Sequence, residues 1–247
     1  MEAIFGLHVE PSIPAGKVGL KYGPLLASVD TFDVEIRGKM GHAAHPHLAL
    51  DPIPVAAQVI LALQTLATRR IDPLQPVVLT ITTLEAGQAK NIIPEKVLLS
   101  GTFRTLNETV RRKLPRLIEE MVAGICTANQ AQYNLEFQYG SPVLHNDERL
   151  MRVVERACRK ALGDENVVML PEPRMGAEDF ANYLEYIPGA FLRLGTRGRP
   201  GTGHSLHSPQ FDVDERAIAV AIETISFLLL SYFQTPPDLL HKPLASH

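Results

Sequence analysis

The chain has 247 residues, of which 45% are hydrophobic and 21% are charged, and its formal net charge is −3. This composition excludes an intrinsically disordered chain, which needs fewer apolar residues. The small negative charge, without long basic runs, argues against a protein that binds nucleic acid or an anionic membrane surface. No apolar run approaches the roughly 20 residues of a membrane span, and the longest run near the C-terminus is 225–232.

The two cysteines, Cys126 and Cys158, lie far apart in the sequence and outside any CxxC motif. A disulfide framework is therefore not expected, and neither cysteine is predicted to be a nucleophile because each falls within a predicted helix beside apolar residues. The first residues show no signal-peptide pattern. These features predict a cytoplasmic protein.

The opening residues 3–9 form an apolar run that predicts a buried strand. Folded domains often begin with a few polar, dispensable residues, and this chain does not. We therefore expect that part of the domain to which this strand belongs precedes the chain.

From residue 31 to residue 140 the hydrophobic pattern predicts strand, helix, strand, strand, helix and strand. The expected strands are 31–37, 76–84, 97–105 and 133–139, and the expected helices are 51–68 and 109–129. This is the order of a ferredoxin-like unit, a four-stranded antiparallel sheet with two helices on one face. Such a sheet leaves a face or an edge strand free to pair with another subunit.

Further along, the pattern predicts a helix over 148–162, a short strand over 190–194 and a long helix over 212–233. Two structural units are therefore expected. Residues 1–30 and 142–235 form a discontinuous α/β unit, residues 31–141 form an inserted α+β unit, and 236–247 form a flexible tail.

Two histidines are placed where a ligand site would lie. His8 is near the carboxyl end of the first strand, where open α/β sheets bind ligands, and its neutral imidazole can bind a metal ion. His207 follows a strand and a glycine-rich loop. Taken alone, His8 is more simply interpreted as a core histidine bonded to a backbone carbonyl, His207 is undecided, and His204 is interpreted as an exposed loop residue.

The remaining candidates are also ambiguous when taken singly. Glu178 and Asp179 are interpreted as acids near a helix N-terminus, and Asn91 as a turn residue. Arg104 is either a solvated strand residue or a carboxylate clamp. The loop 41–47 holds three histidines, of which His42 is the more economical candidate for a function.

Taken together in chain order, these segments resemble the metallopeptidase family M20, in particular its aminoacylase-like branch of amidohydrolases. That branch includes hippurate hydrolases, N-acyl-amino-acid and N-acetyl-diaminopimelate deacylases, and auxin-conjugate hydrolases. The resemblance extends from about residue 3 to residue 233 and is specific for the family rather than for the substrate. Its motifs are 6–11 (GLHVEP), 38–46 (GKMGHAAHP), 51–53 (DPI), 91–94 (NIIP), 101–105 (GTFRT), 176–180 (GAEDF) and 206–209 (LHSP).

The resemblance implies an α/β catalytic domain interrupted by a ferredoxin-like lid or dimerisation domain. It implies that His8 and His207 are ligands of a two-metal site, and that His42 reaches the partner subunit's site and stabilises the oxyanion. Asn91 and Arg104 would bind substrate, with Arg104 on a free carboxylate. Glu178 and Asp179 would support the metal ligands or the substrate.

The chemistry that the resemblance implies is hydrolysis of an amide bond in an N-acyl amino acid or small peptide by a metal-activated water. The metal ions would be zinc, manganese, cobalt or nickel, and the protein would be a homodimer joined through the lid domain. No nucleic-acid or membrane partner is expected.

The sequence departs from the family in lacking an Asp-containing strand motif, a Cys-Gly-His-Asp-type segment and a Glu-Glu pair that supplies the general base. The chain would thus keep two metal ligands of about five, whereas a catalytic zinc usually takes three protein ligands. We expect this polypeptide alone to be inactive or nearly so. Three explanations follow. The sequence is a fragment or a mis-started reading frame of an ordinary M20 amidohydrolase, a separate chain supplies the missing half, or the chain is a non-catalytic, dimer-forming remnant used for binding. The intact motif residues favour the first.

Overall fold

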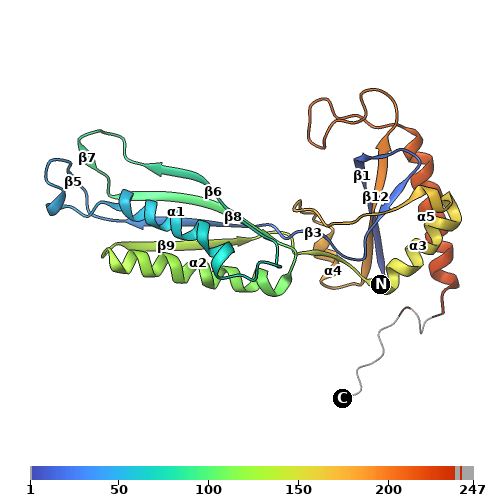
Figure 1. Ribbon diagram of the computed structural model, residues 1–247, viewed down its shortest axis with the longest axis horizontal. Helices are drawn as coiled ribbons and strands as arrows, with labels where there is room; N and C mark the ends of the chain where they lie inside the picture. The colour runs from blue at the N-terminus through green and yellow to red at the C-terminus, as the bar shows by residue number, and fades with distance from the viewer. Residues whose placement is uncertain (1, 237–239, 241–247) are drawn as a thin grey trace, which may run out of the picture. The chain divides into compact units, whose positions relative to one another are not determined.

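The computed structural model describes residues 2–236 and 240, and it shows two compact units (Figure 1). The first unit is formed by Met1–Leu25, Leu144–Pro173 and Phe180–His247, and the second by Leu26–Val143 and Arg174–Asp179. The inserted unit was expected over 31–141; the observed one is slightly longer at both ends and includes the short segment Arg174–Asp179. The expected flexible tail lies outside the described residues, apart from 236 and 240.

The second unit has the expected order of long elements. These are β4 (Asp30–Arg37), α1 (Pro52–Arg69), β6 (Val77–Ala86), β8 (Lys96–Thr105), α2 (Glu108–Ala128) and β9 (Gln132–Tyr139). The strands form an antiparallel sheet in the order β6-β8-β4-β9, which is the ferredoxin-like arrangement. A small second sheet, β5 (Gly41–His42) with β7 (Ile92–Ile93), and the 3-10 helix η1 (Pro46–Leu48) extend one end.

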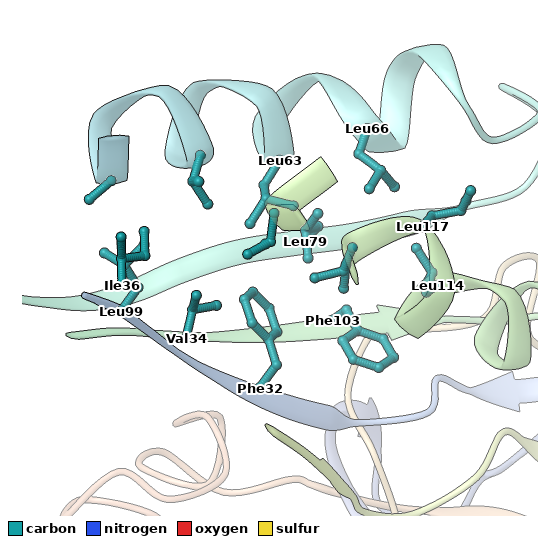
Figure 2. Packing of buried hydrophobic residues seen from close by; sticks show 14 of the residues in the cluster. Phe32, Val34, Ile36, Leu63, Leu66, Leu79, Leu99, Phe103, Leu114 and Leu117 are labelled. Atoms are coloured by element: carbon teal, nitrogen blue, oxygen red, sulfur yellow. The ribbon is translucent and has the colours of Figure 1, made fainter. Parts of the chain in front are cut away.

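Because successive side chains of a strand point to opposite faces of the sheet, one set of side chains faces the helices. Phe32, Val34 and Ile36 on β4 are buried with Leu99 and Phe103 on β8 against apolar residues of α1 and α2 (Figure 2). Their polar neighbours along the strands face away, as expected for a sheet with one covered face. This packing supplies the core of the second unit.

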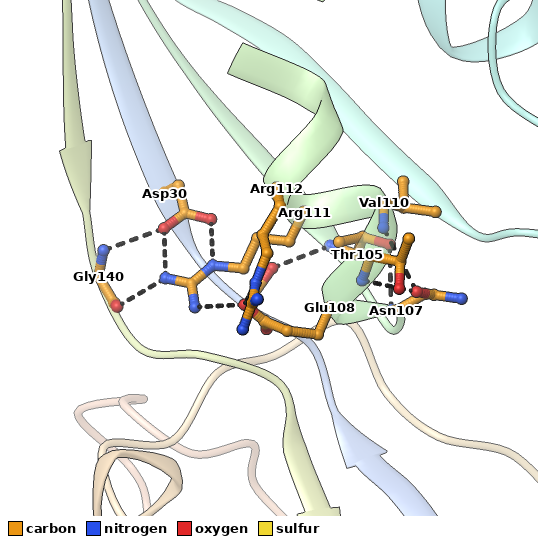
Figure 3. A network of polar contacts seen from close by, with 10 residues as sticks. Asp30, Thr105, Asn107, Glu108, Val110, Arg111, Arg112 and Gly140 are labelled. Atoms are coloured by element: carbon orange, nitrogen blue, oxygen red, sulfur yellow. Dashed lines mark hydrogen bonds and ion pairs between the residues drawn. The ribbon is translucent and has the colours of Figure 1, made fainter. Parts of the chain in front are cut away.

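A buried ion pair ties α2 to the sheet of the second unit (Figure 3). The Arg111 guanidinium donates to both oxygens of Asp30, with Nε–Oδ2 2.9 Å and Nη2–Oδ1 2.8 Å. It also donates to the carbonyl of Gly140, whose own N–H donates back to Asp30. The contact joins the start of β4, the first turn of α2 and the end of β9, and it raises the pKa of Arg111.

The first unit is built on a mixed sheet in the order β1-β12-β2-β11. Its strands are β1 (Ile4–Pro14), β12 (Gly189–Arg197), β2 (Val18–Leu20) and β11 (Val167–Met169), and β3 (Gly23–Leu26) pairs separately with β10 (Leu144–Asn146). The helical elements are α3 (Glu148–Leu162), η2 (Asp164–Asn166), α4 (Ala181–Leu184) and α5 (Arg216–Gln234). Helix α5 begins four residues later than expected, and the Asp214 carboxylate just before it accepts a hydrogen bond from the Arg216 N–H.

Helices α3 and α5 pack together on one face of this sheet. Ala190, Leu192 and Leu194 of β12 share a buried cluster with both helices. Side chains alternate between faces along a strand, so Arg193 and its register partner His8 point to the opposite face. That face is where the first unit carries its candidate site.

Candidate functional site

His8 lies on β1, directly opposite Arg193 of β12 in a parallel register. Its Nδ1 is 2.8 Å from the Val9 carbonyl oxygen. A carbonyl can only accept, so Nδ1 carries the proton and Nε2 carries the lone pair. An imidazole whose other nitrogen donates to a backbone carbonyl has the tautomer and orientation of a metal-binding histidine. The contact with the Val9 carbonyl is compatible with both interpretations of His8. It is the bond expected of a core histidine, and it also fixes the tautomer that a metal ligand needs.

His207 lies in the loop between β12 and α5, with a backbone φ of 65°. This left-handed conformation is uncommon for a residue other than glycine, and such outliers cluster at functional sites. His207 and His8 both line one open hollow of about 490 Å³. The other lining residues are Val9, Leu206, Ser208, Pro209 and Phe211. The structure therefore brings together two histidines that are separated by almost the whole sequence, and it places His204 outside that lining.

A buried ion pair lies beside His8, and the sequence pattern did not reveal it. Glu10, two residues after His8 on the same face of β1, accepts from the Arg193 guanidinium at 2.9 Å, and both side chains are buried. The other oxygen of Glu10 accepts from the Ser12 hydroxyl at 2.6 Å. The pair neutralises a buried cation opposite His8 and joins β1 to β12. An Arg and a Glu separated by 183 positions give no local signal of this contact.

The described side chains do not form a complete metal site. Among the described residues, no group of three or more histidine, cysteine, aspartate or glutamate side chains could hold a metal ion. Two imidazoles on one hollow fall short of the three protein ligands of a catalytic zinc site, and further short of a two-metal site. The described residues therefore do not by themselves form the implied centre, and the ligand roles of His8 and His207 remain predictions.

His42 and Asn91 lie together at one end of the second unit. Strand β5 pairs with β7, so that His42 faces Ile92, and the Ala43 N–H donates to the Asn91 carbonyl at 3.0 Å. The Ala44 N–H donates to Nδ1 of His42 at 3.0 Å. Nδ1 is therefore the acceptor, and the proton of the neutral ring is on the exposed Nε2. His42 thus presents a donor, in contrast to the acceptor that His8 presents.

The neighbouring loop histidines do not form a metal centre. The His45 ring lies 5.7 Å from that of His42 and 6.2 Å from that of His47, measured between ring centroids. They belong to no metal-binding group among the described residues. The hypothesis that His42 alone of the three has a function remains a prediction.

Arg104 lies near the other end of the same unit. It is half-buried on β8, and its Nη1 donates to the Met175 carbonyl at 3.3 Å. Met175 belongs to the segment Arg174–Asp179, which carries the candidate acids Glu178, half-buried, and Asp179, exposed. The roles of these residues in binding substrate or supporting ligands remain predictions.

One chain does not bring His42 and Arg104 together. The β8 strand runs from Lys96, next to the β7 end, to Thr105. At about 3.3 Å per residue, the eight steps from Lys96 to Arg104 span about 26 Å. A single small substrate therefore cannot contact Asn91 or His42 and also Arg104 of the same chain.

The cysteines are buried and free, one in each unit. Burial raises the pKa of both thiols, that of Cys158 to about 12. Both thiols are therefore protonated at neutral pH, in agreement with the prediction that neither is a nucleophile.

Helix α5 bears on the expectation that no segment spans a membrane, which remains a prediction. Helix α5, Arg216–Gln234, is long and apolar enough to cross a membrane, judged by length and composition alone. The apolar runs that it contains are interrupted by Glu223 and by serines, so the sequence did not show one long span. Core helices of soluble proteins meet the same criterion, and one such helix is weak evidence for a membrane.

Comparison with known proteins gives consistent matches. The model of the peptidase family M20/M25/M40 matches residues 1–231. The "Probable hydrolase sll0100" of Synechocystis is 44% identical over 94% of this chain and 59% of its own length. The N-acetyl-L-cysteine deacetylase of Bacillus subtilis is 42% identical over 90% of this chain and 51% of its own length.

A solved structure shows the same fold. The Bacillus subtilis YXEP protein, described as a dinuclear metal binding peptidase from the M20 family, aligns with a TM-score of 0.77 at 32% identity. The alignment covers 96% of this chain and 58% of that protein. The chain thus spans between half and three-fifths of the length of each of these proteins.

Proposed function

The chain belongs to the peptidase family M20/M25/M40, and from that membership we propose that it is part of a metal-dependent amidohydrolase that cleaves N-acyl amino acids or small peptides. The relatives include a deacetylase of N-acetyl-L-cysteine, which supports a small N-acyl substrate. By this proposal the chain alone is inactive, because it holds two metal ligands and no general base.

The observation that carries the proposal is the pair of opposite histidine tautomers. His8 offers a lone pair on Nε2 to a hollow that it shares with His207, which suits a metal ligand. His42 offers an N–H on Nε2, which suits a donor to an oxyanion. Two chemically distinct roles are thus set by two backbone contacts.

The substrate side of the proposal depends on Arg104. Its guanidinium donates through Nη1 to the Met175 carbonyl, and a planar guanidinium can bind a carboxylate with two parallel hydrogen bonds. Arg104 would therefore hold the free carboxylate of an amino acid. Because His42 lies far along the same unit, the histidine that faces this substrate would come from a second copy in a homodimer.

The test uses an exchange protein, in which this chain replaces the matched region of the Bacillus subtilis deacetylase. With added Mn²⁺ or Zn²⁺ it should release acetate from N-acetyl-L-cysteine. His8→Ala or His207→Ala should lower kcat by about 100-fold or more, whereas the matched loop variant His204→Ala should not. A folded exchange protein that is inactive while the parent deacetylase is active, or whose activity survives both substitutions, would contradict the proposal.

A further inference from the structure

A short excursion of the chain lies beside Arg104. After Pro173 of the first unit the chain joins the second unit for Arg174–Asp179, and it returns to the first unit at Phe180. We call Arg174–Asp179 the strap. The rest of the second unit is one continuous segment, Leu26–Val143, so the strap is an addition from a distant part of the sequence. The contacts that hold the strap therefore indicate what it does for the second unit.

Backbone hydrogen bonds hold the strap near the start of the second unit. The Ala27 N–H donates to two strap carbonyls, that of Arg174 at 3.1 Å and that of Gly176 at 2.9 Å. Between these two residues, the Met175 carbonyl accepts from a different donor, Nη1 of Arg104, at 3.3 Å. The position of the Met175 carbonyl is thus set by the backbone on both sides of it.

A second set of hydrogen bonds closes a ring around Arg104. The N–H of Ser28, the residue after Ala27, donates to the Thr105 carbonyl at 2.9 Å, and the Thr105 N–H donates to the Ser28 hydroxyl at 3.3 Å. Both Ser28 and Thr105 are buried. Because Thr105 follows Arg104 in the chain, these bonds fix the backbone beside Arg104 relative to Ala27, which also holds the strap. One connected set of bonds therefore holds both the backbone and the guanidinium of Arg104.

The contact with Met175 uses only one corner of the Arg104 guanidinium. It engages Nη1, whereas Nε and Nη2 form the side edge of the group, with two parallel N–H donors. Arg111 shows how this chain uses such an edge: it binds both oxygens of Asp30 through Nε and Nη2 and also donates to the backbone carbonyl of Gly140. Arg104 has the carbonyl contact of this pattern, and in the proposed function the substrate supplies the carboxylate.

A guanidinium that is already held binds a carboxylate more tightly than one that must first be ordered. The arginine side chain has several rotatable bonds, and ordering it on binding costs conformational entropy. The Met175 carbonyl restricts the Arg104 side chain before a ligand arrives. Because the carbonyl and a side-on carboxylate use different donors of one guanidinium, each contact makes the other less costly to form.

We propose that the strap is a positioning element for carboxylate recognition, in which the Met175 carbonyl holds the Arg104 guanidinium so that its Nε–Nη2 edge receives the free carboxylate of the substrate. This inference rests on the proposed function, in which Arg104 binds that carboxylate. It gives the strap a role in substrate affinity that depends on a backbone carbonyl rather than on a side chain. The contact exists before the reaction and persists through it, so its loss should raise KM and leave kcat nearly unchanged.

The experiment weakens this carbonyl and leaves every side chain in place. Glycolic acid in place of Gly176 converts the Met175–Gly176 amide into an ester, whose carbonyl is a poorer hydrogen-bond acceptor. In the exchange protein this change should raise KM for N-acetyl-L-cysteine by about three- to tenfold, with kcat changed by less than about twofold. Glycolic acid in place of the exposed Gly201 is the matched control and should change neither constant.

Two comparisons isolate the carboxylate. The amide of N-acetyl-L-cysteine has no free carboxylate, so its KM should not respond to the ester at position 176. In an Arg104→Lys background, which lacks the planar fork, the ester should add no further rise in KM for N-acetyl-L-cysteine. A general loss of structure caused by the ester would instead affect both substrates and both backgrounds.

Nuclear magnetic resonance of the guanidinium gives a readout that does not depend on turnover. In the 247-residue chain, the Nε–H signal of Arg104, identified by its loss in Arg104→Lys, reports rotation about the Nε–Cζ bond. The ester at position 176 should speed this rotation by about threefold or more, because the hydrogen bond to Nη1 is weakened. N-acetyl-L-cysteine should shift the signal, its amide should not, and the ester should weaken the binding that the shift reports.

The outcomes separate this inference from the proposed function. Faster rotation and weaker carboxylate binding with the ester, in an exchange protein without turnover, support the positioning role and contradict the proposed function. An active exchange protein whose KM for N-acetyl-L-cysteine is unchanged by the ester overturns the positioning role and leaves the proposed function standing. An ester that lowers kcat, or that acts equally on the amide substrate, also overturns the positioning role. A signal that N-acetyl-L-cysteine does not shift overturns both the positioning role and carboxylate binding by Arg104.

Discussion

The individual side chains near the hollow are organised by contacts that are remote in sequence. The tautomer of His8 depends on the Val9 carbonyl, and the register that aligns His8 with Arg193 depends on strands at opposite ends of the chain. Sequence reasoning could name His8 and His207 only through the family resemblance. Taken singly, neither residue differs from a structural histidine, because local sequence contains no information on which backbone group an imidazole will meet.

The Glu10–Arg193 pair gives a stability prediction. Glu10→Gln leaves the Arg193 guanidinium buried without its counter-charge, and we expect the free energy of unfolding to fall by about 3–5 kcal/mol. Urea denaturation monitored by circular dichroism measures this free energy of unfolding. Glu120→Gln, in an exposed pair with Arg70 and Arg116, should cost no more than about 1 kcal/mol. Equal effects of the two substitutions would contradict the role of burial.

A double variant tests whether the uncompensated charge of Arg193 causes the loss of stability. Replacing both members of the buried pair, by Glu10→Leu with Arg193→Met, removes the uncompensated charge. It should recover most of the stability that Glu10→Gln loses. A double variant as unstable as the single one would mean that Glu10 acts through its contact with Ser12 instead.

Among the helices and strands, the long elements could be predicted from the sequence and the short strands could not. Strands β4, β8 and β9 and helices α1, α2 and α3 have hydrophobic periods long enough to show in the sequence. The strands β2, β3, β10 and β11 have three or four residues each. They are strands because neighbouring backbone pairs with them, and this is tertiary information that no local pattern carries.

The start of α5 gives a prediction on pH. Asp214 accepts from the backbone N–H and the guanidinium of Arg216, and these contacts lower the pKa of Asp214 to about 2. A carboxyl with a lowered pKa stabilises the fold above its ordinary pKa, near 4, and loses that contribution as the pH falls towards 2. The stability difference between the chain and Asp214→Asn should therefore be full at pH 5–7 and shrink below about pH 4.

Chemical denaturation at a series of pH values measures this difference. Asp212→Asn, in an exposed pair with Arg199, provides the comparison and should give a smaller difference throughout. A difference for Asp214→Asn that stays constant from pH 7 to pH 2.5 would show that the carboxylate charge plays no part at the start of α5.

At the scale of the whole molecule, the separation of His42 from Arg104 predicts active sites shared between two subunits. In the exchange protein, His42→Ala should lower kcat by about 100-fold or more because an oxyanion donor is lost. Arg104→Ala should raise KM for substrates that carry a carboxylate. A mixed dimer of the two variants has one site with both residues intact and should regain activity.

Differently tagged copies allow the mixed dimer to be isolated after co-expression. Activity in the mixed dimer, with little in either pure variant, is the expected result. A mixed dimer as inactive as both parents would indicate that His42 and Arg104 act in the same chain or that His42 has no role in the reaction.

We propose that His8 and His207 are two ligands of a metal centre whose other donors lie outside the described residues. Elemental analysis after gel filtration, together with an N-acetyl-L-cysteine hydrolysis assay, tests it most directly. The 247-residue chain alone should retain no tightly bound metal and show no turnover, whereas the exchange protein should retain a dinuclear centre like that of its relative. A chain that alone retains two metal ions and hydrolyses the substrate would contradict the claim.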